Sequence, residues 1–178
     1  MSKKLFLLVL ISCCLSSTAQ SNDDETINWN ENQKLSWADY KGKAITGSDA
    51  AASTSTYLGI EYSFTRNGFD YKITCSFSKI KSWGLNKTDY ILAHEQGHFD
   101  IAEIFARKLN KLMSEYVFNK NTFKEDLKKL YLSLTDEKDA FQNKYDEETN
   151  HSINKVKQTE WLKKIDDLLK ELKAYSNY

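Results

Sequence analysis

Two histidines and a glutamate stand in the run H-E-x-x-H, which is formed by His94, Glu95 and His98. Residues four positions apart lie on the same face of an α-helix, so both imidazoles can reach one metal ion there. The glutamate between them is then placed to take a proton from a water molecule at that ion. The spacing therefore predicts a catalytic zinc site of the metallopeptidase kind, with Glu95 as general base.

The sequence around this motif is helical from about Lys87 to Phe118, and both histidines lie on its apolar face. That face comprises Tyr90, Ile91, His94, His98, Ile101, Phe105, Leu109, Leu112 and Tyr116. Burying such polar groups without partners costs about 1–3 kcal/mol each, and a divalent cation removes that cost. The alternative is a fortuitous match, in which the histidines are core residues satisfied by hydrogen bonds.

Gly97 lies inside this helix, where glycine costs about 1 kcal/mol relative to alanine. We predict that a strand or a neighbouring backbone approaches the helix closely at this position. The alternative is that the helix simply tolerates the glycine.

A catalytic zinc needs a third protein ligand and an open fourth position. Asp100 and Glu103 fall about 240° and 180° round the helix from the first histidine, so neither is expected to reach the ion. The chain has only three histidines, and the remaining one is His151. We predict that a return helix brings His151 to the metal, with Glu147 or Glu148 as the alternative ligand. The remaining alternative is that His151 is an exposed histidine with no role at the site.

A hydrolase of this kind also needs a donor for the oxyanion that develops on the carbonyl. Tyr145 is the candidate nearest to the predicted third ligand. The alternative for Tyr145 is an aromatic side chain that packs on a helix.

A β-hairpin is predicted around Asn67-Gly68, because this dipeptide stands between two alternating apolar runs. With these two residues as the loop, Arg66 faces Phe69, and counting outward pairs apolar with apolar residues. The pairs are Phe64 with Tyr71, Tyr62 with Ile73, Ile60 with Cys75, and Leu58 with Phe77. A slip by one residue would place apolar side chains opposite polar ones.

Other elements surround the hairpin and the motif helix. Leu35-Ser-Trp37 predicts a short strand running into a turn, and two more helices are expected from Phe123 and after Asn154. The pattern predicts an α+β fold with a small antiparallel sheet over about 27–83. A helical part follows over about 87–175, and both belong to one domain spanning residues 21–178.

Residues 1–20 have the features of an export signal: two lysines, the apolar run Leu5–Leu15, and Ser17-Thr-Ala19 as a cleavage site. We therefore expect a secreted or periplasmic protein. Leu10-Ile-Ser-Cys13 resembles a lipoprotein box, and acylation of Cys13 is the alternative, which alone would attach the protein to a membrane.

Composition excludes several other classes. Removal of residues 1–20 leaves 23 basic and 25 acidic residues, so there is no excess of basic residues to bind the phosphates of a nucleic acid. Cys75 becomes the single thiol, which excludes a disulfide framework. No later segment is apolar enough to span a membrane.

Three motifs together resemble an uncharacterised bacterial family described as predicted secreted zinc-dependent proteases. They are Leu35-Ser-Trp-Ala-Asp-Tyr-Lys-Gly42, then His94-Glu-Gln-Gly-His-Phe-Asp-Ile-Ala-Glu103, and finally Tyr145-Asp-x-x-Thr-x-His151 with Gln158 and Trp161. The chain departs from the family at Ser152, where glycine is usual. The resemblance implies a zincin-like fold, in which a small antiparallel sheet packs on the H-E-x-x-H helix and a helical part follows. It also supports His151 as a ligand. It also implies that an extended substrate pairs with a sheet edge such as the hairpin over 58–77.

Two functions follow from these observations. The first is a secreted Zn²⁺-dependent metallopeptidase that acts on peptide or protein substrates in the cell envelope or outside it. The second is a non-catalytic envelope binding module, in which the metal only joins helices or is absent. The lysine-rich amphipathic helices of the C-terminal half suit partner binding and motivate this alternative.

Overall fold

The computed structural model describes residues 25–66 and 68–178. Its strands are β1 (Thr26–Asn28), β2 (Ala52–Ser53), β3 (Thr56–Thr65), β4 (Gly68–Ser78) and β5 (Trp83–Gly84). Its helices are α1 (Asp89–Glu115), α2 (Phe123–Thr149) and α3 (Lys155–Glu171), with short 3-10 helices η1 (Trp37–Asp39) and η2 (Lys173–Tyr175). The predicted export signal and Cys13 lie outside the described residues.

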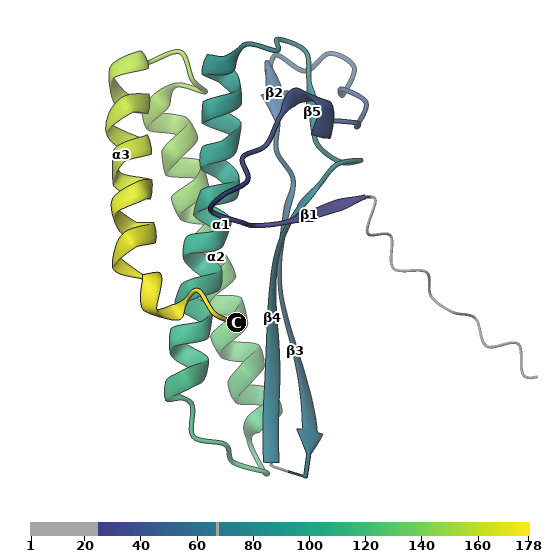
Figure 1. The fold of residues 1–178 in the computed structure, drawn as a ribbon, viewed down its shortest axis with the longest axis vertical. Coiled ribbons are helices and arrows are strands. Elements are labelled where there is room, and N and C mark those ends of the chain that lie inside the picture. Colours follow the sequence, from purple (N-terminus) through teal and green to yellow (C-terminus); the bar gives the residue numbers. More distant parts are fainter. Residues whose placement is uncertain (1–24, 67) are drawn as a thin grey trace, which may run out of the picture.

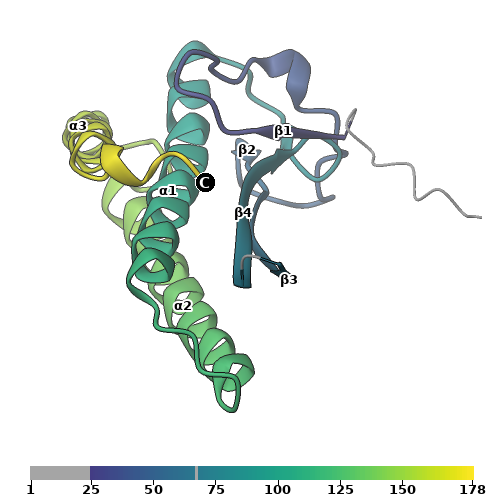
Figure 2. The same cartoon turned by 60° about the horizontal axis from the view of Figure 1, so that its bottom comes forward.

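The molecule combines small antiparallel sheets with three helices packed against them, which confirms the predicted α+β class at this level. One sheet has the strand order β1-β4-β3, and the other pairs β2 with β5. Figures 1 and 2 show α1 between the long β3–β4 hairpin and the pair α2 and α3, and α1 contacts all of these elements.

The central position of α1 explains why this helix is buried on several faces. Ile101, Ala102 and Arg107 lie at least about 100° apart around the helix, yet each is at most 1% exposed. The expected apolar face is therefore only one of several. Asp100 and Glu103 lie on other faces, as their helical phase predicts, and have partners there. Asp100 accepts a hydrogen bond from Trp29 at 2.7 Å, and Glu103 pairs with Arg107 at 2.8 Å.

The β3–β4 hairpin forms where it is predicted, but its register is shifted by two residues. Thr65 pairs with Gly68, and Leu58 pairs with Cys75 instead of Phe77. Side chains in a strand alternate with a period of two, so a shift by two leaves every side chain on its predicted face. The hydrophobic pattern cannot distinguish these registers. Gly68 has a φ of 111°, a conformation that glycine adopts without steric cost.

The segment before β2 is not the predicted strand but the 3-10 helix η1. Ser36 and Asp39 form a capping box, in which the Ser36 backbone N–H donates to the Asp39 carboxylate at 2.8 Å. Trp37 packs so closely on Gly84 that a Cβ there would lie 2.6 Å from the indole ring. The Trp37 indole N–H also donates to the carbonyl of Thr88, the N-cap residue of α1. This segment therefore braces the beginning of the motif helix.

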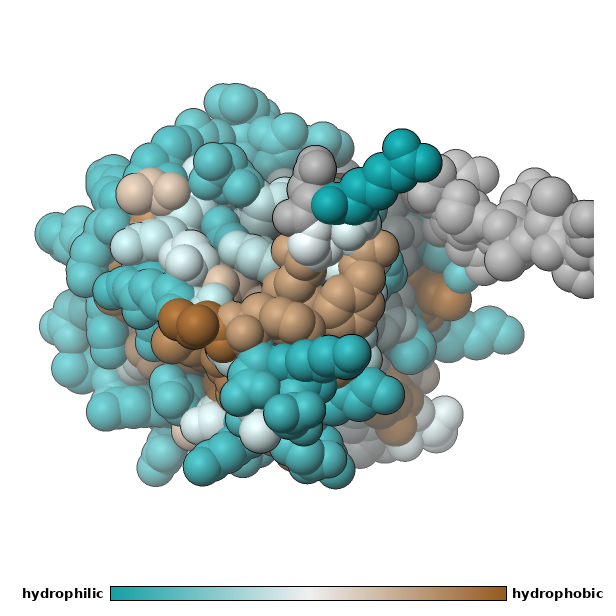
Figure 3. Space-filling view, turned by 90° about the horizontal axis from the view of Figure 1, so that it is seen from below, coloured by the Kyte–Doolittle hydropathy of each residue, from teal (hydrophilic) through white to brown (hydrophobic). Residues whose placement is uncertain are grey.

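The end of the molecule far from α3 carries an apolar surface, seen as a brown area framed by teal in Figure 3. Aromatic rings from the hairpin tip and the α1–α2 connection cluster there, and Phe64 and Phe118 are among the exposed ones. Among the described residues, no helix has the length and apolar character needed to span a membrane.

Candidate metal site

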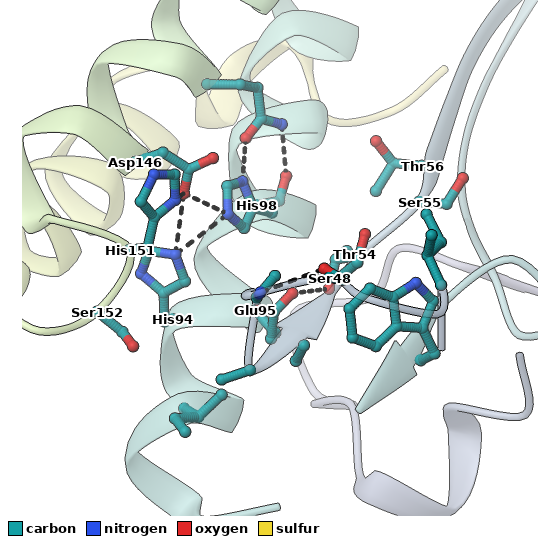
Figure 4. A pocket seen from close by; sticks show the side chains of 18 of the residues that line it. Ser48, Thr54, Ser55, Thr56, His94, Glu95, His98, Asp146, His151 and Ser152 are labelled. Atoms are coloured by element: carbon teal, nitrogen blue, oxygen red, sulfur yellow. Dashed lines mark hydrogen bonds and ion pairs between the residues drawn. The ribbon is translucent and has the colours of Figure 1, made fainter. Parts of the chain in front are cut away.

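Three ligand atoms converge where α1 passes the end of α2 (Figure 4). The Nε2 atoms of His94 and His98 lie 3.3 Å apart, and Oδ1 of Asp146 lies 3.1 Å from the first and 3.0 Å from the second. His94 is 3% exposed, and the other two side chains are partly buried. Within the described residues, this is the His/Cys/Asp/Glu group whose spacing suits a metal ion.

The spacing of these three atoms fits a tetrahedral zinc site. Zinc bonds of about 2.0–2.1 Å to nitrogen and oxygen imply ligand atoms about 3.3–3.4 Å apart in a tetrahedron. The three observed separations of 3.0–3.3 Å are only slightly shorter. A small expansion would admit an ion with three protein ligands.

The hydrogen bonds of His98 indicate that a cation is needed at this point. Gln142 donates its Nε2–H to the His98 carbonyl at 2.9 Å, which directs its Oε1 toward His98 Nδ1 at 2.5 Å. Nδ1 must then carry the ring proton, so Nε2 of a neutral His98 presents a lone pair to the Asp146 carboxylate. Two acceptors at 3.0 Å repel one another unless a proton or a metal ion lies between them. The side chains present therefore fit a cation.

Without a metal ion, a proton supplies the positive charge between His98 and Asp146. Burial lowers the pKa of His98, but the hydrogen bond and charge attraction to Asp146, together with Glu95 and Gln142, outweigh burial, and the net pKa is raised. Burial raises the pKa of Asp146, while hydrogen bonds from His94 and His98 lower it, and the net pKa is well below the usual range. A metal ion held by these residues would replace the proton between the same atoms.

Tyr145 holds α1 and α2 together beside the two histidines. Its ring is fully buried and stacks on the His94 ring at 4.5 Å, and its hydroxyl donates to the His94 carbonyl at 3.2 Å. A Cβ at position 97 would lie 2.5 Å from that hydroxyl, so the predicted close approach at Gly97 is made by a side chain. Burial raises the pKa of Tyr145. This position favours the packing alternative over contact with a reacting group.

Glu95 points from α1 toward β2 and its neighbours (Figure 4). The Thr54 hydroxyl donates to the Glu95 carboxylate at 2.6 Å, and the Tyr40 hydroxyl lies 2.8 Å from Thr54 Oγ1. Since Thr54 uses its proton on Glu95, Tyr40 must donate to Thr54. Burial raises the pKa of Tyr40, so this donor stays protonated. The chain Tyr40–Thr54–Glu95 fixes the carboxylate beside the candidate metal ligands.

Glu95 and the three ligands line an open hollow of about 590 Å³. Its other rim is formed by the segment Ala50–Thr56, which contributes small side chains including Ser53, Thr54 and Ser55. Because these side chains are small, they leave space in the hollow along this rim. An extended chain can therefore lie against this rim within reach of Glu95.

His151 lies at the mouth of the same hollow but outside the group of three. Its side chain is 74% exposed, and its Nδ1 is 3.9 Å from Oδ1 of Asp146. Asn150, His151 and Ser152 all have positive φ, between 48° and 72°. A left-handed conformation at position 152 explains a preference for glycine there. Ligation by His151 stays a prediction, with Asp146 in the third position of this structure.

The two glutamates considered as alternative ligands do not join the group. Glu148 accepts a hydrogen bond from the Trp161 indole at 2.8 Å and so braces α3 against α2. Glu147 is exposed. Asp146, Gln142 and Thr54 are the residues of the site that were not predicted. Asp146 stands inside the Tyr145-to-His151 motif, which was the available signal for it.

Comparison with known proteins identifies the family. Residues 30–152 match the family described as "Bacterial protein of unknown function (DUF922)", and the chain belongs to this family. The match includes η1, the H-E-x-x-H helix and Asp146, so the complete candidate site lies within it. Neither the curated proteins nor the solved structures contained a match.

Proposed function

We propose that this protein is a zinc-dependent metallopeptidase of zincin-like architecture that acts after export from the cell. The observation that supports this most is the convergence of His94, His98 and Asp146 beside Glu95, at the edge of an open hollow. Three protein ligands with an accessible side are typical of catalytic zinc, whereas structural zinc is enclosed by four.

The residues at the hollow suit peptide hydrolysis. Zinc held by the three ligands would polarise a scissile carbonyl and lower the pKa of water to about 7. Glu95 takes the proton of the attacking water and delivers it to the leaving amine. Thr54 and Tyr40 keep the carboxylate oriented through both transfers. Peptide or protein chains are the proposed substrates, because the hollow is open and one rim is an extended backbone.

The second candidate is a binding module with a structural metal, and one observation favours it. His151 lies close enough to Asp146 that a change in its side-chain conformation would supply a fourth ligand and close the site. The two functions therefore differ in the number of protein ligands around the ion.

The test is to purify residues 21–178, measure bound zinc by elemental analysis, and assay hydrolysis of fluorescein-labelled casein. We expect about one zinc per chain and casein hydrolysis that a chelator abolishes. Glu95→Gln should keep the zinc and lose at least about 100-fold in rate, since general acid–base catalysis contributes about 10²–10⁴-fold.

Glu115→Gln, at the other end of α1, is the matched control and should retain full activity. A chain without stoichiometric zinc would end the proposal. Activity that persists in Glu95→Gln would remove Glu95 from its role. Four protein ligands in a spectroscopic analysis of the cobalt-substituted protein would favour the structural module.

A further inference from the structure

A second hollow lies further along β3 and α2. It has a volume of about 410 Å³ and is lined by Gly59, Ile60 and Tyr62 of β3, with Lys124, Leu127, Lys128 and Tyr131 of α2. Thr56, at the beginning of β3, lines the first hollow, as do Lys138 and Asp146 on the later part of α2. The same two elements therefore form rims of both hollows, in consecutive stretches.

Leu58 and Tyr131 lie between the two hollows. The Tyr131 hydroxyl donates to the Leu58 carbonyl at 2.5 Å, and this contact joins α2 to β3. β3 is the edge strand of its sheet, so its other side has no neighbouring strand. Because the Tyr131–Leu58 contact occupies the edge at this point, an extended chain that leaves the first hollow would pass over the solvent side of the contact to reach the second hollow.

The charges along this path are strongly biased. α2 as a whole is acidic, with eight aspartates and glutamates and five lysines. Its charged residues that line the two hollows are Lys124, Lys128, Lys138 and Asp146, and the last is a candidate metal ligand. Apart from that ligand, every charged α2 side chain on the path is a lysine.

These lysines are available to a bound chain. Lys124 and Lys128 are exposed and make no ion pair within the described residues. Lys138 lines the first hollow with 16% of its side chain exposed, and within the described residues its ion-pair partner is the exposed Asp139, at 2.7 Å. An ion pair with an exposed partner contributes little to stability, so a better-placed carboxylate would replace it.

We infer that the hollows form one binding path for an extended, acidic segment of a polypeptide, held by Lys124, Lys128 and Lys138. This inference rests on the proposed function for the identity of the bound chain as a substrate. It adds the substrate class, which is an acidic polypeptide bound well beyond the bond to be cleaved.

The helix sets where acidic residues should fall in such a substrate. Lys138 is eight residues from Asp146, about 12 Å along the helix at about 1.5 Å per residue. Lys128 is ten residues further, about 15 Å more. At about 3.3 Å per residue of an extended chain, these lysines lie about four and eight residues from the metal site. A bound segment of about ten residues would contact all three lysines.

The test uses two fluorescein-labelled probes, a deca-glutamate and a deca-glutamine peptide, and measures binding to the mature chain by fluorescence anisotropy. Each titration is run with zinc and again after chelation, because glutamates also bind zinc directly. We expect tighter binding of deca-glutamate under both conditions. The triple variant Lys124→Gln, Lys128→Gln, Lys138→Gln should weaken deca-glutamate binding about tenfold, as three exposed ion pairs imply.

The matched control removes three exposed lysines that do not line the path: Lys129→Gln, Lys144→Gln and Lys163→Gln. It changes net charge equally and should alter affinity less than about twofold. Equal losses in the two triple variants, or no preference for deca-glutamate, would overturn the inference. Thermal unfolding of both variants establishes that they fold.

The outcomes also separate this inference from the proposed function. Lysine-dependent binding in a protein that never hydrolyses casein would keep the path and remove the peptidase. Casein hydrolysis without lysine-dependent binding would keep the peptidase and remove the path.

Discussion

Asp146 is the residue that joins the histidine pair on α1 to a second helix. Helical phase alone partly predicts which acidic residue of α2 faces α1. At about 100° per residue, Glu147 falls about 180° from the centre of the buried face of α2, while Asp146 and Glu148 fall on its two flanks. Which flank meets α1 depends on the placement of α3, where Trp161 engages Glu148. That choice is tertiary, so the sequence predicted His94, Glu95 and His98 but not Asp146.

Replacement of Asp146 tests the ligand set directly. Asp146→Asn preserves shape but removes the charge, and we expect zinc affinity to fall at least about 100-fold, the scale of losing a first-sphere carboxylate. Competition with a zinc-sensitive dye gives the affinity. Glu147→Gln, the exposed neighbour, should bind zinc normally.

His151→Ala completes the comparison, because the sequence had predicted this residue as the ligand. With Asp146 in third position, His151→Ala should change zinc affinity less than about threefold. A loss as large as that of Asp146→Asn would instead establish His151 as a ligand.

Gln142 acts on the metal site through His98. Its amide accepts from Nδ1 and donates to the His98 carbonyl, so it selects the tautomer whose Nε2 is free for a metal. Gln142→Leu should weaken zinc binding about 10–100-fold, the usual effect of removing such a partner. Nitrogen chemical shifts of the His98 ring should show a mixture of tautomers in the metal-free variant. Normal affinity together with an unchanged tautomer would contradict this role.

At the scale of elements, the two ligand-bearing helices approach closely at Gly97 and Tyr145. The glycine predicted a close neighbour, but the sequence around it does not identify that neighbour as Tyr145, which is 48 residues away. The hairpin shows a similar limit. Alternation fixed which face each side chain of β3 and β4 occupies, whereas the register depends on a loop geometry that the alternation does not contain. Patterns with a short period therefore predict faces, and long-range contacts remain open.

Gly97→Ala should destabilise the protein, because its Cβ would lie 2.5 Å from the Tyr145 hydroxyl. We expect a loss of about 1–3 kcal/mol in the free energy of unfolding, typical of overpacking. Urea unfolding of both single variants and of the double variant with Tyr145→Phe gives the coupling. Removal of the hydroxyl should recover about 0.5 kcal/mol or more of the loss. Strictly additive effects would mean that the helices separate freely here.

At the scale of the molecule, the sequence predicted the α+β class and the three helices, because long periodic segments carry strong signals. It missed the 3-10 helix at Trp37 and the Tyr40–Thr54–Glu95 chain, whose members come from three separate segments. The candidate metal site is likewise assembled from distant parts of the chain. Its stability should therefore depend on the ion.

Zinc should raise the melting temperature of the protein that comprises residues 21–178. At a free concentration about 100 times the Kd, the stabilisation is about 2.7 kcal/mol. For a chain of this size, that corresponds to a rise of about 5–10 °C, which differential scanning fluorimetry would detect. A chelator should reverse the shift, and Asp146→Asn should show none. An equal shift in that variant would place the stabilising ion elsewhere.

His94 and Asp146 are separated by 52 residues and meet only after α1 and α2 have packed. An unfolded chain therefore has no preformed pocket for the ion, and affinity arises together with the tertiary structure. A protein that passes unfolded through an export channel would cross without bound zinc and would bind zinc in the compartment it enters. Under the proposed function, the supply of zinc outside the cytoplasm would then decide how many molecules become active.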